Sequence, residues 1–477
     1  MMNRIFKRAK DYPKIDSLVV IYVGVVLFFQ TLLQIAPAVT FLAKTPLYSI
    51  QTYLGLLGDG LILLDVFTTK RIWQGKGWYL LWAILAFAAV ASVRMAAYGL
   101  KENLFKLCWM TIQFLLVYSC AYRIPKEQLE SRIRSFFYVL LAIWTLCCCV
   151  SFYQYVNQIG YETVVNPLAK DTSINRQGFH GNRLYGIFYT LNHAAYVSLF
   201  FAVIAAVFAL QEKRIWVKLS LIATQVVLLV YIVLSGSRSA LLALLACAVI
   251  TVFLVVRYGL KKGSRWKNAF FAAVMVLLIA GCCFGHKGIK TGLAKLPALW
   301  GNGVSQESTL DRTDLDISTS GRIKIWSDYL SLQDEIGLTG LSPGNYMPYV
   351  IQEHPKLYIA YNAQHNHPDK YNAGIIYHVH SGYLMVYVSA GLLGAIALAA
   401  FMLLCLIRTI YLIWKSKRGN PWFVCTLLLV VAGAISAAFD EGLFFQNNPQ
   451  TTMFWFALGL VMSGRLTETE NDEIQNT

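Results

Sequence analysis

Long apolar segments separated by polar connections dominate this 477-residue chain and limit what it can fold into. A helix that crosses a bilayer needs about 20 consecutive, mostly apolar residues. The sequence predicts twelve such helices, near residues 18–42, 47–67, 77–98, 103–122, 135–156, 191–211, 215–235, 238–256, 268–285, 381–408, 421–439 and 451–464. We therefore expect an all-α integral membrane protein, and the composition, 57% hydrophobic and 14% charged, agrees with that class. The first segment is too long for a cleavable signal and is expected to stay as an anchor.

Basic residues concentrate in alternate connections between these segments. The basic set comprises the N-terminal segment and residues 68–77, 122–134, 211–218, 257–267 and 408–419. Cytoplasmic loops keep Lys and Arg, so both termini are expected in the cytoplasm, with the two long connections, 157–190 and 286–380, outside the cytoplasmic membrane. This distribution accounts for the net charge of +16 without a nucleic-acid partner.

One arginine stands at a predicted outer helix end, in the sequence LSGSRSAL (234–241). Ser235 and Ser237 are residue types that cap helix N-termini, so Arg238 falls in the first turn of the next helix. A helix N-terminus is already partly positive, and a cation there is unfavourable unless an anion binds. The pattern favours an anion site at Arg238 and Ser237; the alternative is an arginine that extends to the lipid headgroups.

A second outer arginine, Arg322, begins a predicted amphipathic helix within residues 318–332. A glycine-rich turn follows at 336–346. The residues that suit an N-cap are Ser318, Thr319 and Ser320, and the apolar residues at helical spacing are Ile323, Trp326 and Leu330. Here too a cation occupies the end that the helix dipole disfavours, although a solvated surface arginine is the ordinary explanation for such a helix taken alone.

Histidines gather in the long connection before the predicted span at 381–408. Six of the eight lie there: His286, His354, His365, His367, His378 and His380. A neutral imidazole can take a proton from a sugar hydroxyl near neutral pH. The two His-X-His pairs could instead hold a metal, but no carboxylate or cysteine pattern of metal-ligand spacing accompanies them, so no metal is expected. The Asp-Leu-Asp sequence at 314–316 is too short a match to the acidic pair of metal-dependent glycosyltransferases to carry weight.

Four segments together resemble the bacterial O-antigen ligase and O-antigen polymerase superfamily of integral-membrane glycosyltransferases. They are GNRLYGIFYTLNHAAY (181–196), similar to its Arg-x-x-Gly-x-x-x-x-x-Asn segment; SGSRSALLALL (235–245), similar to its Ser-x-Ser-Arg segment; SGRIKIWSDYL with GLTGLSPGNY (320–330 and 337–346), similar to its Gly-Arg-x-x-x-Trp helix and glycine turn; and HSGYLMVYVSAGLLG (380–394), similar to its His-Asn-x-x-Leu segment. Ser381 stands where the family usually has Asn, and the turn reads GLSPGN where Gly-x-Gly is common.

The resemblance implies a GT-C-like, metal-independent, inverting enzyme without a cofactor. Such an enzyme takes a glycan from undecaprenyl diphosphate and joins it to an acceptor hydroxyl on a glycan or glycolipid at the outer face. Carried onto this chain, the family motifs assign the diphosphate to Arg238, Arg322, Arg183 and Ser237, and the acceptor hydroxyl to His380. They also divide the chain into N-terminal helices (1–180), a ligase-like region (181–410) that contains the outer loop 286–380, and two final helices with a cytoplasmic tail (411–477).

Two alternatives remain at this stage. Within the superfamily, a ligase and a repeat-unit polymerase for O-antigen, capsule or exopolysaccharide differ only in the acceptor, which the sequence does not identify. From another class, a lipid-linked-glycan transporter would also have many spans, but it would carry ionisable residues within them and broken helices in matching halves. The candidates for such residues are few: Asp59, Asp65 and, near an outer end, Glu441.

Overall fold

The computed structural model describes residues 14–68, 75–125, 133–163, 175–259, 286–300, 321–416 and 419–467. Eleven of the twelve predicted apolar segments are helical, and the segment 268–285 lies outside the described residues. The long apolar elements are α2 (Lys14–Leu32), α3 (Ala36–Leu42), α4 (Ile50–Thr68), α5 (Trp78–Arg94), α6 (Lys101–Thr111) continued by a π-helical turn η4 (Ile112–Val117) and α7 (Tyr118–Arg123), α9 (Arg134–Val156), α10 (Leu191–Gln211), α11 (Ile215–Ser235), α12 (Arg238–Gly259), α21 (Gly382–Lys415), α22 (Pro421–Ala437) and α23 (Pro449–Ser463). The first predicted span is thus divided, with α2 and α3 separated at residues 33–35.

Seven helices within the described ranges are long and apolar enough to cross a membrane. They span Pro46–Thr68, Lys101–Arg123, Arg134–Val156, Leu191–Gln211, Ile215–Ser235, Arg238–Tyr258 and Gly382–Lys415. Three shorter apolar helices accompany them, at Asp16–Leu32, Trp78–Arg94 and Pro421–Ala437. The chain is therefore a mostly helical, multi-pass membrane protein; the number of twelve crossings and the GT-C architecture stay predictions.

Two helices, α10 and α23, form the centre of the bundle. Of the seven candidate spans, α10 has the largest buried share, and every residue of α23 from Pro449 to Met462 is buried. Large aromatic side chains fill the space around them: the indole of Trp455 packs against Phe114 with ring centroids 4.5 Å apart. The start of α10 is therefore held in the protein interior, which positions the side chains of its first turns.

The connections predicted to lie outside gather at one end of the long helices. There the side-chain amide of Asn345 donates to the carbonyl of Gly99 at 2.9 Å, and the amide of Gly344 donates to Asn103 at 2.7 Å. At the opposite end, Arg123 pairs with Asp16 at 3.0 Å and with Asp65 at 3.2 Å, all three buried. Asp65 thus belongs to an ion-pair network at a helix end and is not an isolated charge within a span.

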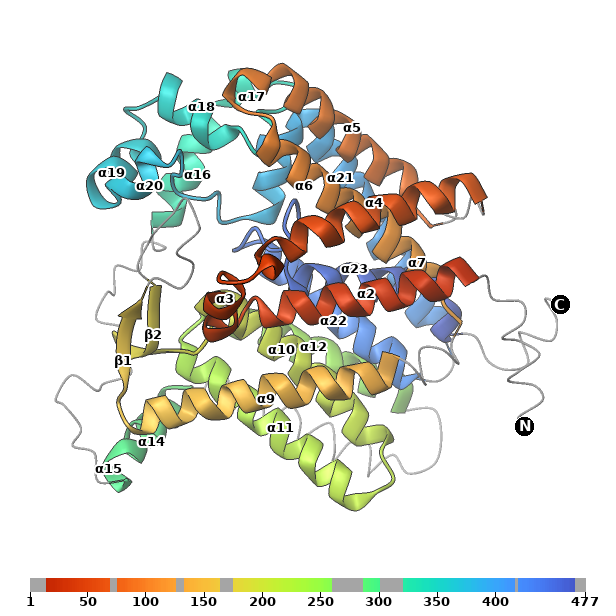
Figure 1. Ribbon diagram of the computed structural model, residues 1–477. Coiled ribbons are helices and arrows are strands. Elements are labelled where there is room, and N and C mark those ends of the chain that lie inside the picture. Colours follow the sequence, from red (N-terminus) through yellow and green to blue (C-terminus); the bar gives the residue numbers. More distant parts are fainter. Residues whose placement is uncertain are drawn as a thin grey trace.

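Small helices and a sheet cover the end of the bundle that is predicted to lie outside (Figure 1). The helices are η1 (Pro46–Ser49), η3 (Ala96–Tyr98), α14 (His286–Ala294), α15 (Leu296–Leu299), α16 (Arg322–Ser331), α17 (Gln333–Ile336), α18 (Tyr346–Glu353), α19 (Tyr358–Asn366) and α20 (Pro368–Asn372), and η7 (Arg465–Thr467) follows α23 at the other end. The antiparallel sheet, in the order β1-β2-β3, comprises β1 (Gly160–Thr163), β2 (Asn175–His180) and β3 (Arg183–Gly186). This sheet was not predicted, because residues 157–190 were interpreted only as a long connection.

The glycine-rich turn that follows α16 and α17 is hydrogen-bonded to α21 at a break in that helix. Gly391 interrupts that helix with φ of 70°, and the exposed amides of Leu392 and Leu393 donate to the carbonyls of Gly337 (3.1 Å) and Leu338 (3.2 Å). A helix break inside a membrane protein needs such partners for its backbone groups. The break therefore anchors the outer helices to a membrane-spanning one.

Candidate active site

The turn before Arg238 has the predicted position, but its serines do not cap α12. Gly236 ends α11 with φ of 64°, and the hydroxyl of Ser235 accepts the amide of Ser237 at 3.2 Å and donates to Ile232 at 2.7 Å. Ser237 Oγ is buried and has no hydrogen-bond partner within the described part of the chain. The prediction of N-caps is thus wrong, because the Ser235 hydroxyl stabilises the end of α11. The first amides of α12 are left without a serine cap.

Arg183 lies against this same turn. It is the first residue of β3, and its Nε donates to the carbonyl of Ser235 at 2.9 Å. The hydroxyl of Tyr231 on α11 donates to the carbonyl of Tyr185 at 3.2 Å, which holds the strand to the helix. Arg183 and Arg238, which are 55 positions apart in the chain, are therefore brought to one turn.

Arg322 begins α16, whose buried face differs from the predicted one. Ile323 and Leu330, expected to be buried, are 58% and 51% exposed, whereas Ile325 and Tyr329 are buried. The N-cap residue is Gly321 with φ of 75°, and residues 318–320 lie outside the described residues. Of the three predicted residues only Trp326 packs against the core, because helical spacing alone does not determine which neighbouring positions face inward.

The register of α16 against the chain before α21 brings Arg322 to His380. The hydroxyl of Tyr329 donates to the carbonyl of Tyr377 at 2.8 Å, and Trp326 Nε1 donates to the carbonyl of Val379 at 2.8 Å. Tyr329, Trp326 and Arg322 lie at successive turns on one face of the helix. Arg322, one turn before Trp326, is close enough to His380 to act on it electrostatically.

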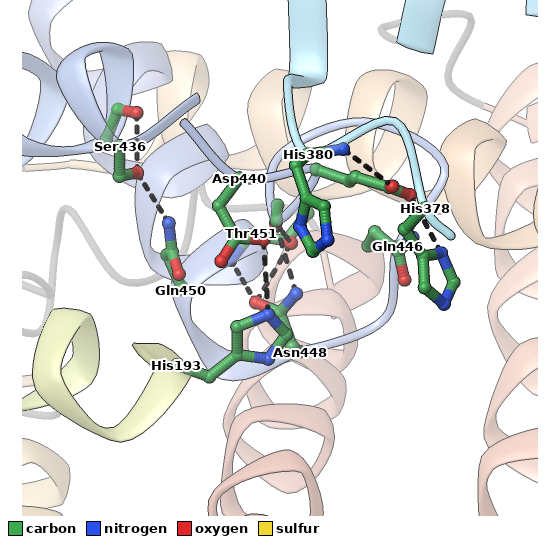
Figure 2. A network of polar contacts seen from close by, with 12 residues as sticks. His193, His378, His380, Ser436, Asp440, Gln446, Asn448, Gln450 and Thr451 are labelled. Carbon is green, nitrogen blue, oxygen red and sulfur yellow. Dashed lines mark hydrogen bonds and ion pairs between the residues drawn. The ribbon is translucent and has the colours of Figure 1, made fainter. Parts of the chain in front are cut away.

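Two carboxylates beside His380 complete a polar cluster (Figure 2). Glu441 accepts the backbone amide of His380 at 3.1 Å through Oε1 and lies 3.4 Å from His378 Nδ1 through Oε2. Asp440 lies 3.4 Å from Nε2 of His193, in the first turn of α10. Figure 2 shows His378 on one side of His380, and Asp440 with His193 on the other.

Burial lowers the pKa of the His380 imidazole from its ordinary value of 6.5, since desolvation disfavours the charged form. The neighbouring charges of His378 and Arg322 act in the same direction, while the two carboxylates oppose it. The ring is therefore held neutral at neutral pH, and a neutral imidazole can accept a proton.

Burial raises the pKa of an isolated carboxyl group, but the pKa values of Glu441 and Asp440 are lowered. Burial on its own would raise the pKa of Glu441, but His378 and nearby cations hold it at about 2. Burial likewise opposes ionisation of Asp440, but the attraction and hydrogen bond of His193 lower the pKa of that carboxyl below 3.8. Both groups are thus ionised at neutral pH and place two negative charges beside the histidines.

Arg238 and Arg322, by contrast, form no ion pair with a carboxylate of the described residues. Arg238 is exposed and Arg322 is half-buried. Tyr196 on α10 is close to both parts of the site. Its side chain lies near Ser239, the residue after Arg238, and within the electrostatic reach of Arg322. Guanidinium groups left without carboxylates can bind phosphate oxygens in a bidentate manner.

The other histidines are dispersed over the outer helices. His365 on α19 contacts the carbonyl of Tyr361 at 2.7 Å, and His354 lies 3.6 Å from Glu335. In the described ranges no three His, Cys, Asp or Glu side chains are grouped so that they could hold a metal ion. The Asp-Leu-Asp sequence at 314–316 lies outside the described residues.

Sequence reasoning missed His193 and Asp440 and gave Glu441 no role in the site. The signal was the acidic pair in the sequence FDEGLF (439–444), between two apolar segments at an outer end. A pair of carboxylates at such a position needs cations or donors to stabilise it. His193 carried no comparable signal, because it lies within an apolar helix and becomes a partner of Asp440 only through folding.

The fold and the cluster define a class: a helical, multi-pass membrane protein with a polar site of arginines, histidines and carboxylates at one end of its helices. Residues 223–399 match a family model described as O-Antigen ligase. This match confirms, over that part of the chain, the resemblance to the O-antigen ligase and polymerase superfamily. No curated protein matches the chain.

Proposed function

We propose that this protein transfers a glycan from undecaprenyl diphosphate to an acceptor hydroxyl at the outer face of the cytoplasmic membrane. The register of α16, which brings Arg322 to His380, carries the proposal. This register supports a reaction in which Arg322 neutralises the leaving diphosphate while His380 takes the proton of the incoming hydroxyl. The family match supports the same class of reaction, either a ligase or a polymerase.

In the proposed reaction the acceptor oxygen attacks the anomeric carbon of the donor sugar from the side opposite the diphosphate. The bond between that carbon and the phosphate oxygen breaks, so the configuration inverts and undecaprenyl diphosphate leaves with the bonding pair. His380 takes the proton of the attacking hydroxyl. Arg238 and Arg322 stabilise the charge that grows on the diphosphate, with Arg183 and Ser237 at the turn before Arg238.

The arginine pair is tested by transfer assays on membranes that contain equal amounts of each variant. Arg238→Ala and Arg322→Ala are expected to abolish transfer, and Arg238→Lys is expected not to restore it, because an ammonium cannot make the bidentate contact. The matched control is Lys324→Ala, an exposed cation on α16 that faces Tyr358. Near-normal transfer by Arg238→Lys would instead support a contact with lipid headgroups.

Ligase and polymerase are distinguished by the glycans of a strain that lacks the gene. Loss of all attached polymer indicates a ligase, whereas single repeat units that remain attached indicate a polymerase. Neither reaction requires a different role for Arg238, Arg322 or His380, because the two differ only in the acceptor.

A further inference from the structure

A pocket of about 250 Å³ has His378 in its wall. Phe105 and Trp109 of α6 line it together with the turn at 445–447. Ligand pockets for drug-sized molecules usually measure about 300–1,000 Å³. A volume below that range suits one sugar ring and excludes an oligosaccharide.

The lining combines aromatic faces with polar groups that lack partners. Phe105 is half-buried, so its ring offers an apolar face to one side of a ligand, whereas Trp109 is almost fully buried and exposes little of its ring. Asn447 Nδ2 and Trp109 Nε1 are buried without hydrogen-bond partners within the described part of the chain, and the half-buried Lys106 lies within electrostatic reach of Glu441. Unpartnered buried donors are costly unless a ligand supplies acceptors, and sugar hydroxyls are such acceptors.

One carboxylate connects this pocket to the candidate base. His378, in the wall of the pocket, contacts Oε2 of Glu441, while Oε1 accepts the amide of His380. The centroids of the two imidazole rings are 6.4 Å apart. A ligand in the pocket therefore lies about the width of one sugar ring from the imidazole of His380, on the side of α6. Arg322 acts on His380 electrostatically from α16, a different element.

We infer that this pocket, between α6 and the turn at 445–447, holds a sugar ring of the acceptor and presents its hydroxyl to His380. The inference rests on the proposed function, since it assigns the donor to the arginines and the acceptor to the α6 side. Lys106 and Glu102, one helical turn apart in the lining, bind the hydroxyls of that ring. The N-terminal helices thereby contribute to the choice of acceptor.

Sugar binding can be measured without catalysis. The full-length protein in nanodiscs is studied by saturation-transfer NMR with the methyl glycosides of glucose, galactose and N-acetylglucosamine as probes. At least one probe is expected to bind the wild type and to lose binding in Lys106→Ala and in Glu102→Ala. Lys101→Ala, an exposed cation at the start of α6 outside the pocket, is expected to bind as the wild type does.

The same variants are then compared in transfer assays. Lys106→Ala is expected to raise the acceptor KM about tenfold, the loss of one charged hydrogen bond, with donor retention unchanged. Absence of any probe binding to the wild type, an unchanged KM in Lys106→Ala, or competition of the probes with the lipid donor would each overturn the inference. If the wild-type protein binds a probe but shows no transferase activity, the proposed function is contradicted and the sugar pocket is not, because binding is measured without turnover.

Discussion

His380 occupies a backbone conformation that few side chains adopt. Its φ of 51° lies in the left-handed region, and its amide is fixed by Glu441 while Ser381 accepts the amide of Leu384 at the start of α21. Backbone strain of this kind costs about 1–3 kcal/mol and persists where the surroundings hold it. The strained residue and the carboxylate that holds it therefore form a unit, which places the imidazole between α16 and α10.

The lowered pKa of His380 predicts the acid limb of the pH profile. A base must be unprotonated, so activity is expected to fall as pH decreases through the pKa of this imidazole. Because burial lowers that pKa, the acid limb of kcat/KM should lie below pH 6.5. The profile is measured with purified protein at saturating donor. A limb above pH 6.5 would show that another group, or a protonated His380, controls the reaction.

Replacement of Glu441 by Gln tests the same base through its neighbour. The amide oxygen of Gln can still accept the His380 amide, but the negative charge that raises the imidazole pKa is removed. The acid limb is expected to move to lower pH, with a lower kcat because the base is weaker. Thermal unfolding provides the control for structural damage. A purely structural role predicts a loss of stability with an unshifted pH profile.

The position of a single site residue could be predicted where the local sequence determines it. Arg238 follows a short turn, Gly236 and Ser237, between two apolar segments, so its place at a helix start was set by segment lengths. Arg322 was placed on its helix, but the buried face was wrong, because Ile325 and Tyr329 bury against chain some 50 residues later. Contacts at that separation leave no periodic signal, and the same holds for His193 with Asp440.

At the scale of elements, the break in α21 determines how the outer helices are held. A Cβ on Gly391 would lie 2.3 Å from the carbonyl of Leu338, and a Cβ on Gly340 would lie 2.5 Å from the backbone at Ser389. Backbone at such distances cannot move without displacing the turn that follows α16 and α17. The position of Arg322 therefore depends on two glycines far from it in sequence.

Gly391→Ala is expected to lower the thermal stability by an amount equivalent to about 2–4 kcal/mol, from left-handed strain and backbone overlap. Glycan transfer should fall with it, since α16 loses its anchor. The matched control is Gly60→Ala in α4, where an added Cβ meets nothing within 4 Å and helix propensity favours Ala. Thermal unfolding in detergent measures both. Equal melting temperatures for Gly391→Ala and the wild type would show that the break is not a rigid anchor.

Apolar segments of membrane length were predicted well because lipid requires continuous helices with satisfied backbones. The division between α2 and α3 was not predicted, since residues 33–35 remain mostly apolar while their backbone pairs with residues 187–189. The sheet of β1, β2 and β3 was not predicted either, because its sequence lacks the pattern of a strand. Its strands are four to six residues long and carry no regular alternation of apolar residues.

At the scale of the whole molecule, the two ends of the bundle are chemically different. The sheet and α16–α20 lie at one end, and α7, which carries Arg123 and its ion pairs, lies at the other (Figure 1). The distribution of basic residues predicts that the second end faces the cytoplasm. The polar cluster would then face the side on which the proposed lipid-linked donor and the acceptor meet.

Cysteine labelling on intact cells measures this orientation. Lys356→Cys, exposed between α18 and α19, should react with a membrane-impermeant maleimide, because the account places it outside. Lys213→Cys, exposed between α10 and α11, should react only after the membrane is permeabilised. Labelling of Lys213→Cys in intact cells would reverse the orientation and move the whole site to the cytoplasmic face.

The central claim, that arginines bind the donor and His380 acts on the acceptor, is tested most directly by following donor retention and product formation in parallel. In nanodiscs, His380→Ala is expected to retain the lipid diphosphate donor while product formation falls about 10²–10⁴-fold, and Arg322→Ala is expected to lose both. EDTA should leave the wild-type rate unchanged. Loss of activity in EDTA that added metal restores, or normal product formation by His380→Ala, would contradict the account.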